Sequence, residues 1–358
     1  MRCVFDNIIF DLQKTGGISV VWYELLSRIL KESNISPLFI DSVSSDNGFR
    51  KLLNISERDI VKEKTTVISS MLPVKMCHSH PFIFHSSYYR YCNNPGVVNV
   101  TTVHDFTYEF FRKGPAKWRH QICKYQAIRH SQYIVCISEN TKKDLLHFLP
   151  DIDENRIRVI YNGVSKDYYP IAGLLDNVGV PFNKGSFVVF VGSRKGYKNF
   201  DLLKKCISKT GYKLVIVGSK LTEKEKSELE QFISKEEYCD MGFLPNAALN
   251  KIYNNAAALV YPSSYEGFGI PVLEAQSAGC PVIAYNSSSI PEIIGETPLL
   301  MQELTEKELI AKMRLLSDNT LMKDVVSKGL HNATLFSWDK MYSEYLKLYE
   351  EIWRSISW

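Results

Sequence analysis

The sequence predicts an α/β protein with two domains, each a mostly parallel sheet covered by helices on both faces. Short apolar runs alternate with helical patterns in both halves of the chain, and the alternation lapses between Ser165 and Gly185. Strand followed by helix, repeated, is the pattern of a parallel sheet. Length supports two domains, because 358 residues, 45% of them apolar, exceed what one ordinary α/β unit needs.

In the first half, strands and helices are expected in regular alternation. The expected strands are Cys3–Phe10, Pro37–Ile40, Pro81–His85, Val97–Val103, Tyr133–Ile137 and Arg158–Tyr161. The expected helices are Ile18–Leu30, a basic segment between 112 and 130, and Thr141–Phe148. Asp6 and Asn7 break the first apolar run, so the start of the chain lacks the long apolar core of a secretory signal.

The second half repeats the pattern after a stretch rich in Tyr, Pro, Gly, Asn and Asp, which predicts a linker. Its expected strands are Phe187–Gly192, Lys213–Gly218, Tyr238–Phe243, Ala258–Tyr261 and Pro281–Tyr285. Aromatic and aliphatic side chains at helical spacing then predict a final amphipathic helix that packs across both domains. We expect two Rossmann-like domains facing each other across a cleft, with ligand sites at the carboxyl ends of the strands. The expected bounds are 1–165, a linker at 166–185, 186–335, and a C-terminal helix at 336–358 that crosses back to the first domain.

Composition favours a soluble cytoplasmic protein without a metal. The net charge is only +4, and no apolar run approaches the length of a membrane span. The eight cysteines are scattered and form no Cys-x-x-Cys pair, as expected of free thiols in a reducing compartment. The one cluster, Cys77-His78-Ser79-His80 with His85 and Cys92 beyond, does not have the spacing of a usual zinc site.

The segment Glu266–Glu274 is the most informative about function. It follows a buried strand, and its sequence Glu-Gly-Phe-Gly-Ile-Pro-Val-Leu-Glu places Pro271 where the first turn of a helix tolerates proline. The amides that open this helix would form an anion site at the positive end of the helix dipole. Glu266 and Glu274 would accept hydrogen bonds from hydroxyls. A nucleotide sugar would use all of these features, whereas the alternative is a capped helix with two solvated acids.

A basic turn follows the strand that ends at Gly192. The sequence Ser-Arg-Lys-Gly-Tyr-Lys-Asn at 193–199 displays cations on a glycine-containing turn. Such cations suit a diphosphate, which arginine binds through two parallel hydrogen bonds and lysine neutralises as a point charge. Arg194 and Lys198 are therefore candidates to stabilise a leaving group in place of a divalent ion. The alternative is a solvated basic turn.

Two further candidates lie in the first half. Gly16 and Gly17 open the expected helix at Ile18, where glycine permits close approach of a ligand to the backbone, although the sequence does not form a P-loop. His104 follows the strand that ends at Val103, so its imidazole would project into the cleft and position the reacting centre. A structural histidine bonded to a carboxylate is the alternative.

Two other sequence patterns, an Asp-x-Asp and a basic segment, indicate a function less directly. Asp151 and Asp153 satisfy Asp-x-Asp, but they lie in a polar loop and not at the end of a central strand, so we expect no metal there. Between Arg112 and His130 there are six Lys or Arg, no acidic residue, and interleaved Trp118 and Tyr125. Such a helix can lie on anionic lipid or hold an acceptor that bears phosphate, and the alternatives are nucleic-acid binding and a solvated helix face.

Together these residues resemble the retaining glycosyltransferases of family 4, which have the two-domain GT-B fold. Glu266 and Glu274 match the family's E-x7-E motif, the turn around Arg194 and Lys198 matches its diphosphate-binding turn, and Gly16-Gly17 matches its N-terminal loop. The resemblance implies metal-independent transfer of a sugar from a nucleotide diphosphate donor, with the anomeric configuration kept and no cofactor. It implies that Glu274 holds the donor ribose, that Arg194 and Lys198 hold the diphosphate, and that His104 lies near the reacting carbon. The implied donor-binding set is Gly16, Gly17, Gly192, Arg194, Lys198, Gly242, Phe243, Leu244, Glu266, Gly267, Phe268, Gly269, Ile270 and Glu274.

The resemblance extends to bacterial enzymes that build surface polysaccharides, several of them mannosyltransferases. We therefore hypothesise GDP-mannose as donor and a glycan or lipid-linked sugar as acceptor, with the protein in the cytoplasm, at the inner face of the membrane if the basic helix contacts lipid. The rival interpretations are a GT-B epimerase, which would act without an acceptor, a phosphorylase, which would need a longer chain, and a nucleic-acid-binding protein, whose binding would fall steeply with salt.

Overall fold

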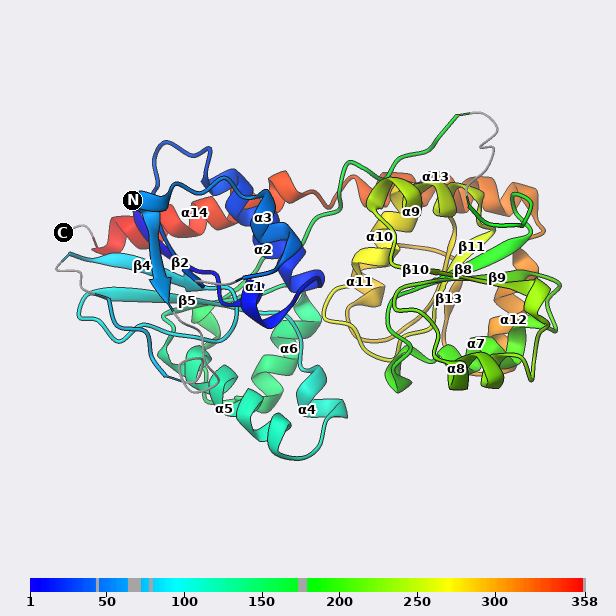
Figure 1. Cartoon of the computed structure of the whole chain (residues 1–358), viewed down its shortest axis with the longest axis horizontal. Coiled ribbons are helices and arrows are strands. Elements are labelled where there is room, and N and C mark those ends of the chain that lie inside the picture. Colours follow the sequence, from blue (N-terminus) through cyan, green and yellow to red (C-terminus); the bar gives the residue numbers. More distant parts are fainter. Residues whose placement is uncertain (43–44, 64–71, 77–79, 173–178, 357–358) are drawn as a thin grey trace. The chain divides into compact units, whose positions relative to one another are not determined.

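The structure is a computed structural model of the whole chain, and it describes residues 1–42, 45–63, 72–76, 80–172 and 179–356. The chain divides into two compact units. The N-terminal unit comprises Met1–Asn162 and the C-terminal segment that begins at Trp338, and the C-terminal unit comprises Gly163–Ser337 (Figure 1). Each unit is an α/β domain around its own sheet, as the alternating pattern predicts.

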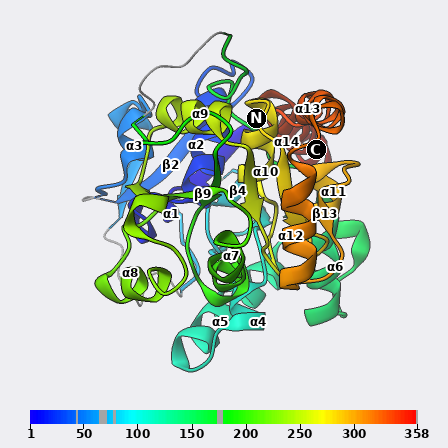
Figure 2. The same cartoon turned by 90° about the vertical axis from the view of Figure 1, so that its right-hand side faces the viewer.

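The described part of the N-terminal unit contains a seven-stranded parallel sheet in the order β3-β2-β1-β4-β5-β6-β7. The strands are β1 (Arg2–Asp6), β2 (Ser36–Ser42), β3 (Ile60–Glu63), β4 (Phe82–Ser86), β5 (Val97–Val103), β6 (Tyr133–Cys136) and β7 (Ile157–Val159). The helices are α1 (Ile9–Leu12), α2 (Gly17–Ile29), α3 (Gly48–Leu52), α4 (Thr107–Phe111), α5 (Pro115–His130), α6 (Glu139–Phe148) and α14 (Trp338–Ile356). In Figures 1 and 2, α2 and α14 cover one face of this sheet, and α5 and α6 cover the other.

The final helix, α14, belongs to the N-terminal unit, where it packs against α2 and β4. Two buried tyrosines fix it to the sheet: the Tyr349 hydroxyl lies 2.6 Å from His85 Nδ1, and the Tyr345 hydroxyl lies 3.0 Å from Thr102 Oγ1. His85 Nε2 in turn lies 2.9 Å from Thr102 Oγ1. The aromatic stripe predicted from the sequence is therefore a packing surface for the sheet of this unit.

In the C-terminal unit the described residues form a six-stranded parallel sheet in the order β10-β9-β8-β11-β12-β13. The strands are β8 (Phe187–Val191), β9 (Lys213–Val217), β10 (Tyr238–Gly242), β11 (Ala258–Tyr261), β12 (Val282–Tyr285) and β13 (Leu300–Met301). The helices are α7 (Phe200–Ile207), α8 (Glu223–Leu229), α9 (Asn246–Asn255), α10 (Ile270–Ser277), α11 (Ile290–Ile294), α12 (Glu306–Leu315) and α13 (Asn319–Ala333). Figures 1 and 2 show α7 and α12 on one face, with α9, α10 and α13 on the other.

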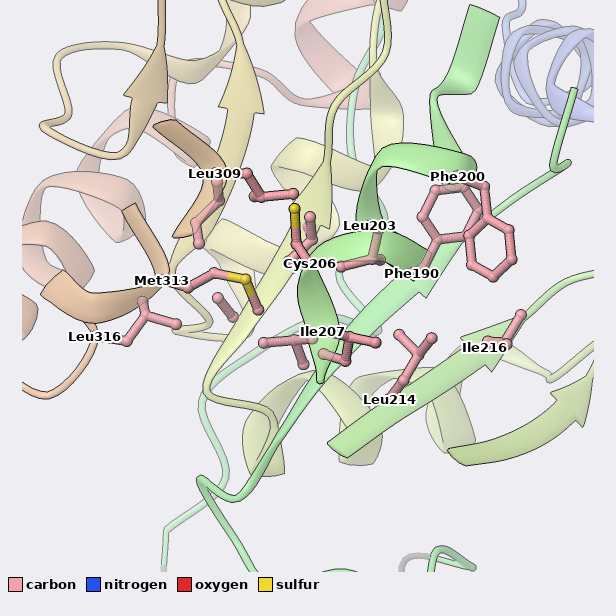
Figure 3. Packing of buried hydrophobic residues seen from close by; sticks show 14 of the residues in the cluster. Phe190, Phe200, Leu203, Cys206, Ile207, Leu214, Ile216, Leu309, Met313 and Leu316 are labelled. Carbon is pink, nitrogen blue, oxygen red and sulfur yellow. The ribbon is translucent and has the colours of Figure 1, made fainter. Parts of the chain in front are cut away.

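The core under α7 and α12 shows why the apolar runs become strands. Phe190 and Ile216 of the sheet pack against Leu203 of α7 and Met313 of α12, and all four side chains are buried (Figure 3). Such runs are buried on both faces in a parallel sheet and are therefore apolar throughout. They give this unit a rigid platform on which the loops at the carboxyl ends of the strands are placed.

Two expectations about local structure differ from the structure. The first strand ends at Asp6, and the apolar residues after it continue into α1, because the backbone turns at Asn7 and Ile8. The start of the expected linker packs on the C-terminal unit: the Tyr169 and Ile171 amides donate to side chains of α9, at 3.2 and 2.7 Å. These asparagine side chains on α9 satisfy backbone groups that a free linker would expose to water.

Candidate active site

The loop between β11 and α10 has the geometry that the Glu266–Glu274 segment predicts. Helix α10 begins at Ile270 with Pro271 in its first turn, and Gly269 caps it with a left-handed backbone, φ 112°. The left-handed backbone favours glycine there, and a Cβ at Gly269 would also crowd Ile290 Cδ1, at 3.0 Å. The helix N-terminus is thus formed by a turn that favours glycine, with Gly267 and Phe268 directly before it.

Three consecutive serines after β12 hold this loop in place. The Ser287 hydroxyl donates to Ser264 O at 2.6 Å, and the Glu266 amide donates to Ser288 Oγ at 2.8 Å. The fully buried Ser289 Oγ lies 3.0 and 2.8 Å from the carbonyl oxygens of Glu266 and Phe268. Sequence reasoning missed these serines, although a run of three hydroxyl residues after a buried strand is a signal that could have found them.

The structure brings two of the candidate residues, Lys198 and Glu266, into direct contact. Lys198 Nζ forms a close ion pair with Glu266 Oε1 and lies 3.2 Å from the Tyr261 hydroxyl. Both charged side chains are only 12% exposed. The site therefore places a largely buried lysine beside a carboxylate, at the carboxyl end of β11, and that carboxylate can accept hydrogen bonds from ligand hydroxyls.

Asn199, next in the chain, explains why these two segments meet. Its backbone is left-handed, with φ 52°, which asparagine tolerates better than most residues. Its side-chain amide donates to Pro262 O at 2.8 Å and to Ser264 Oγ at 2.7 Å. Asn199 thereby ties the basic turn to the loop that carries Glu266.

Arg194 does not join this pair among the contacts of the described residues. Its guanidinium forms two hydrogen bonds with the carboxylate of Glu225, at 2.7 and 3.2 Å, and donates to Ser219 O at 2.8 Å and Lys220 O at 3.1 Å. The pairing with Arg194 lowers the pKa of Glu225 to about 2. Arg194 therefore anchors the start of α8 in this structure.

Glu274 lies in α10 among tyrosines that the sequence did not single out. Its Oε2 accepts a hydrogen bond from the Tyr253 hydroxyl at 3.2 Å, and Tyr168 is a second hydrogen-bonding partner. Burial raises the pKa of Glu274 to about 7 even though both tyrosines favour the charged form. The carboxyl group is therefore poised between its two protonation states near neutral pH.

Glycines line the carboxyl ends of the adjacent strands β8, β9 and β10. Gly192, Gly218 and Gly242 all have positive φ, of 114°, 144° and 66°. A Cβ at Gly218 would lie 2.6 Å from Gly192 O, so these backbones approach more closely than any side chain permits. Beyond Gly242, Phe243 is 77% exposed and Leu244 is partly buried. Sequence reasoning named Gly192 and Gly242 but missed Gly218.

The first-half candidates belong to the N-terminal unit. Gly17 is the first residue of α2, and a Cβ there would meet no atom within 4 Å, whereas one at Gly16 would meet Gln13 Oε1 at 2.3 Å. His104 follows β5 as expected, but it is 7% exposed, and burial lowers its pKa to about 4. Its imidazole is neutral at physiological pH and is buried, where a side chain projecting into an open cleft was expected.

The basic segment 112–130 has two different surfaces. Lys124 is fully buried, paired with Glu109 at 3.2 Å, and Arg129 is paired with Asp151 at 3.3 Å. The basic side chains of this segment therefore do not all point to solvent as free charges, since Lys124 is buried in an ion pair and Arg129 is paired at the surface. The first half of the segment lies beside exposed apolar side chains, which are Phe110 (46%), Phe111 (44%), Trp118 (66%) and Ile122 (48%).

Within the described ranges, no group of three or more His, Cys, Asp or Glu side chains could hold a metal ion. Cys77, His78 and Ser79 of the sequence cluster lie outside the described residues. Asp151 lies in a turn, and Asp153 caps a short 3-10 helix by accepting from the Asn155 amide at 3.0 Å. The helices of the described chain include none with the length and apolar character needed to cross a membrane.

Comparison with known proteins identifies the class. Two family models match the chain: glycosyl transferases group 1 over residues 176–330 and glycosyltransferase family 4 over residues 71–168. An O-antigen chain mannosyltransferase B of Escherichia coli is 24% identical over 70% of this chain and 70% of its own length. An uncharacterised glycosyltransferase of Methanocaldococcus jannaschii is 28% identical over 73% of this chain and 70% of its own length.

Solved structures agree on the fold. A glycosyltransferase from Rickettsia africae superposes with a TM-score of 0.71 and 19% identity over 98% of both chains. Anabaena HepE in complex with UDP and glucose superposes with a TM-score of 0.72 and 15% identity over 97% of this chain and 99% of its own. The chain is thus a glycosyltransferase with the GT-B type of fold. Within that class, residues 71–168 resemble glycosyltransferase family 4, and mannosyltransferases are among the similar proteins.

Proposed function

We propose that this chain is a retaining, metal-independent hexosyltransferase that takes mannose from GDP-mannose and transfers it to a growing polysaccharide. The observation that carries the proposal is the shielded Lys198–Glu266 pair beside the N-terminus of α10. A cation, a helix N-terminus and a hydroxyl acceptor within one loop suit the diphosphate and the sugar of one donor. The choice of mannose is supported by the relatives named as mannosyltransferases, and GDP is the nucleotide that we propose to carry it.

The donor would extend along the carboxyl ends of the strands in the C-terminal unit. Glu274 would bind the ribose hydroxyls, Lys198 the diphosphate, and Glu266 a hydroxyl of the sugar. The three glycine backbones at Gly192, Gly218 and Gly242 would let the nucleotide approach the sheet closely. Exposed Phe243, directly after Gly242, would stack on the base.

The proposed reaction needs a group that stabilises the negative charge on the leaving diphosphate, and it needs no nucleophile from the protein. The bond between the anomeric carbon and the diphosphate oxygen breaks, and a bond to the acceptor oxygen forms on the same face of the sugar. The departing phosphate takes the acceptor's proton, so atoms and charge balance without a further reactant. Lys198 would stabilise the negative charge that grows on the leaving group. Arg194 would share this role only if the diphosphate replaced Glu225 as its partner.

The donor assignment is tested by titration calorimetry with GDP-mannose, UDP-glucose and GDP. We expect heat of binding from GDP-mannose and none from UDP-glucose. Lys198→Ala should weaken binding by about 1.5 to 3 kcal/mol, because a charge-assisted hydrogen bond to phosphate is lost. Lys195→Ala, an exposed lysine of the same turn, is the matched control and should bind as the wild type does. Equal loss in both variants, or binding of UDP-glucose alone, would contradict the assignment.

We also propose that the exposed apolar and basic surface around the start of α5 contacts the membrane that carries the acceptor. Aromatic side chains sit well at a bilayer interface, and each Lys or Arg near anionic lipid contributes about 1 kcal/mol. Ile122→Ser with Trp118→Ser should reduce flotation with vesicles of phosphatidylcholine and phosphatidylglycerol. Phe232→Ser, an exposed aromatic of the C-terminal unit, is the control. Flotation that the double variant leaves unchanged would reject this surface.

A further inference from the structure

Tyr261 is the last residue of β11, and its hydroxyl lies at the Lys198–Glu266 pair of the candidate active site. The side chain is only 3% exposed. Its strand is hydrogen-bonded on both sides, to β8 and to β12. The position of this tyrosine is therefore fixed by the sheet and does not depend on the loop that follows.

The Tyr261 hydroxyl contacts both members of the pair. Lys198 Nζ donates to it at 3.2 Å, and the Glu266 carboxylate is its second hydrogen-bonding partner. Burial, together with the adjacent carboxylate of Glu266, raises the pKa of Tyr261 well above its ordinary value, so the hydroxyl keeps its proton at physiological pH. A protonated hydroxyl can accept from an ammonium and donate to a carboxylate at the same time. Tyr261 thus connects the cation and the anion of the pair.

Two aromatic rings also surround the Lys198 ammonium. Its Nζ lies 5.1 Å from the centroid of the Tyr261 ring and 5.5 Å from that of the Tyr197 ring, within the range of cation–π attraction. The Ser264 amide donates to Tyr197 O at 2.8 Å, which ties the turn that carries Lys198 to the loop after β11. The ammonium is therefore held by polar and aromatic contacts from two segments of the chain.

These contacts set the orientation of the ammonium. A lysine ammonium has three N–H donors. Among the described residues, the polar partners of Lys198 Nζ are Glu266 Oε1 and the Tyr261 hydroxyl. With two donors directed at these oxygens, the direction of the third is fixed by the tetrahedral geometry of the nitrogen. Without the Tyr261 hydroxyl, the ammonium could rotate about its contact with Glu266, and the third donor would lose that direction.

We propose that Tyr261 is a positioning residue for the departure of the diphosphate: its hydroxyl orients the Lys198 ammonium so that the third N–H is presented to the leaving group. Tyr261 acts through Lys198 and not by a contact of its own with the diphosphate. The orientation matters most in the transition state, because negative charge grows there on the leaving oxygen. This inference rests on the proposed function, because it adds a residue to that reaction.

A double-mutant cycle tests whether Tyr261 acts through Lys198. The release of GDP from GDP-mannose is measured for the wild type, Tyr261→Phe, Lys198→Ala and the variant that carries both substitutions, with kcat and KM determined separately. We expect Tyr261→Phe to lower kcat by about tenfold and to change KM by less than about threefold. In the Lys198→Ala background, the same substitution should change kcat by less than about twofold.

Chemical labelling tests the contact with Lys198 without any donor. The full chain is acetylated briefly with an N-hydroxysuccinimide ester, and mass spectrometry compares the labelling of Lys198 with that of the exposed Lys195 in the same turn. We expect this ratio to rise by about two- to tenfold in Tyr261→Phe, because the ammonium leaves its pair more often when one partner is lost. Tyr212→Phe removes the hydroxyl of a half-buried tyrosine in the core under α7; as the matched control, it should keep the wild-type ratio and kcat.

The outcomes distinguish this inference from the proposed function. An equal loss of kcat from Tyr261→Phe in both backgrounds would show a merely structural role, and it would overturn the proposal. An unchanged labelling ratio in Tyr261→Phe would overturn it as well. Thermal unfolding shows that the variants compared are folded, and Tyr261→Phe is nearly isosteric. If the wild type releases no GDP from GDP-mannose, the donor assignment fails, and the labelling ratio then decides whether Tyr261 holds Lys198.

Discussion

At the residue scale, the surroundings of Glu274 set the pKa of its carboxyl group and thereby link the stability of the fold to pH. Burial opposes its charge and raises its pKa from an ordinary value near 4.5 to about 7, although hydrogen bonding with Tyr253 and Tyr168 favours the charged form. A carboxyl whose pKa is higher in the folded protein stabilises the fold fully below the ordinary pKa. That contribution is lost as pH rises through 7.

We therefore predict that the free energy of unfolding falls between pH 5 and pH 8, by up to about 3 kcal/mol from this residue. Glu274→Gln should flatten this part of the profile in urea unfolding and should still weaken donor binding at pH 8. In the wild type, affinity for GDP-mannose should rise from pH 6 to pH 8, because the ionised carboxylate is the better acceptor for ribose hydroxyls. An unfolding profile that the substitution leaves unchanged would show that Glu274 does not titrate in this range.

At the scale of single elements, the loop before α10 is held by serines as well as by its glycines. Ser289 contacts two carbonyl oxygens of the loop, and Ser288 receives the Glu266 amide. We predict that Ser289→Ala lowers donor affinity by about 1 kcal/mol or more, although Ser289 lies behind the loop, because buried carbonyls lose a partner and the loop loosens. Titration calorimetry with GDP-mannose measures this.

Ser317→Ala is the matched control, because the Ser317 hydroxyl donates to Arg314 O at 2.8 Å at an exposed helix end far along the chain. An unchanged affinity in Ser289→Ala, with the fold intact, would mean that the loop needs no such support. If Ser289→Ala and Ser317→Ala lose donor affinity equally, the loop likewise needs no support from Ser289.

The elements themselves were largely predictable from the sequence. The strand Val97–Val103 and the helix after Gly269 follow from apolar runs and from glycine and proline signals, and the structure confirms both. The short edge strands Ile60–Glu63 and Leu300–Met301 were missed, since so few residues at a sheet edge leave no clear apolar run. The partner of Arg194 was also missed, because Glu225 is brought to it by the end of the next strand and not by sequence spacing.

At the scale of the whole molecule, the division into units does not follow the order of the chain. Helix α14 returns to the sheet of the N-terminal unit, where Tyr349 and His85 are both buried and bonded at 2.6 Å. Burial lowers the pKa of His85 to about 3, so its ring is neutral and can share this hydrogen bond. The helix thus fixes the last part of the chain onto its first sheet.

We predict that Tyr349→Phe destabilises the N-terminal unit by about 1 to 3 kcal/mol, because the buried His85 Nδ1 loses its hydrogen-bond partner. Tyr342→Phe, on a less buried part of the same helix and 2.9 Å from Glu32, should cost less. Urea unfolding followed by the fluorescence of Trp22, which lies 5.0 Å from the His85 ring, reports on this region. Equal stability of the two variants would contradict the anchoring role of Tyr349.

The central claim is that Lys198 neutralises the diphosphate of a sugar donor without a metal ion. The most direct test is the consumption of GDP-mannose in excess chelator, followed by proton NMR in wild type and Lys198→Ala. The account predicts that the wild type releases GDP with chelator present, that α-mannose is the first sugar product when water replaces the acceptor, and that Lys198→Ala slows release by about tenfold to a hundredfold. Loss of all wild-type activity in chelator, or full activity of Lys198→Ala, would contradict it.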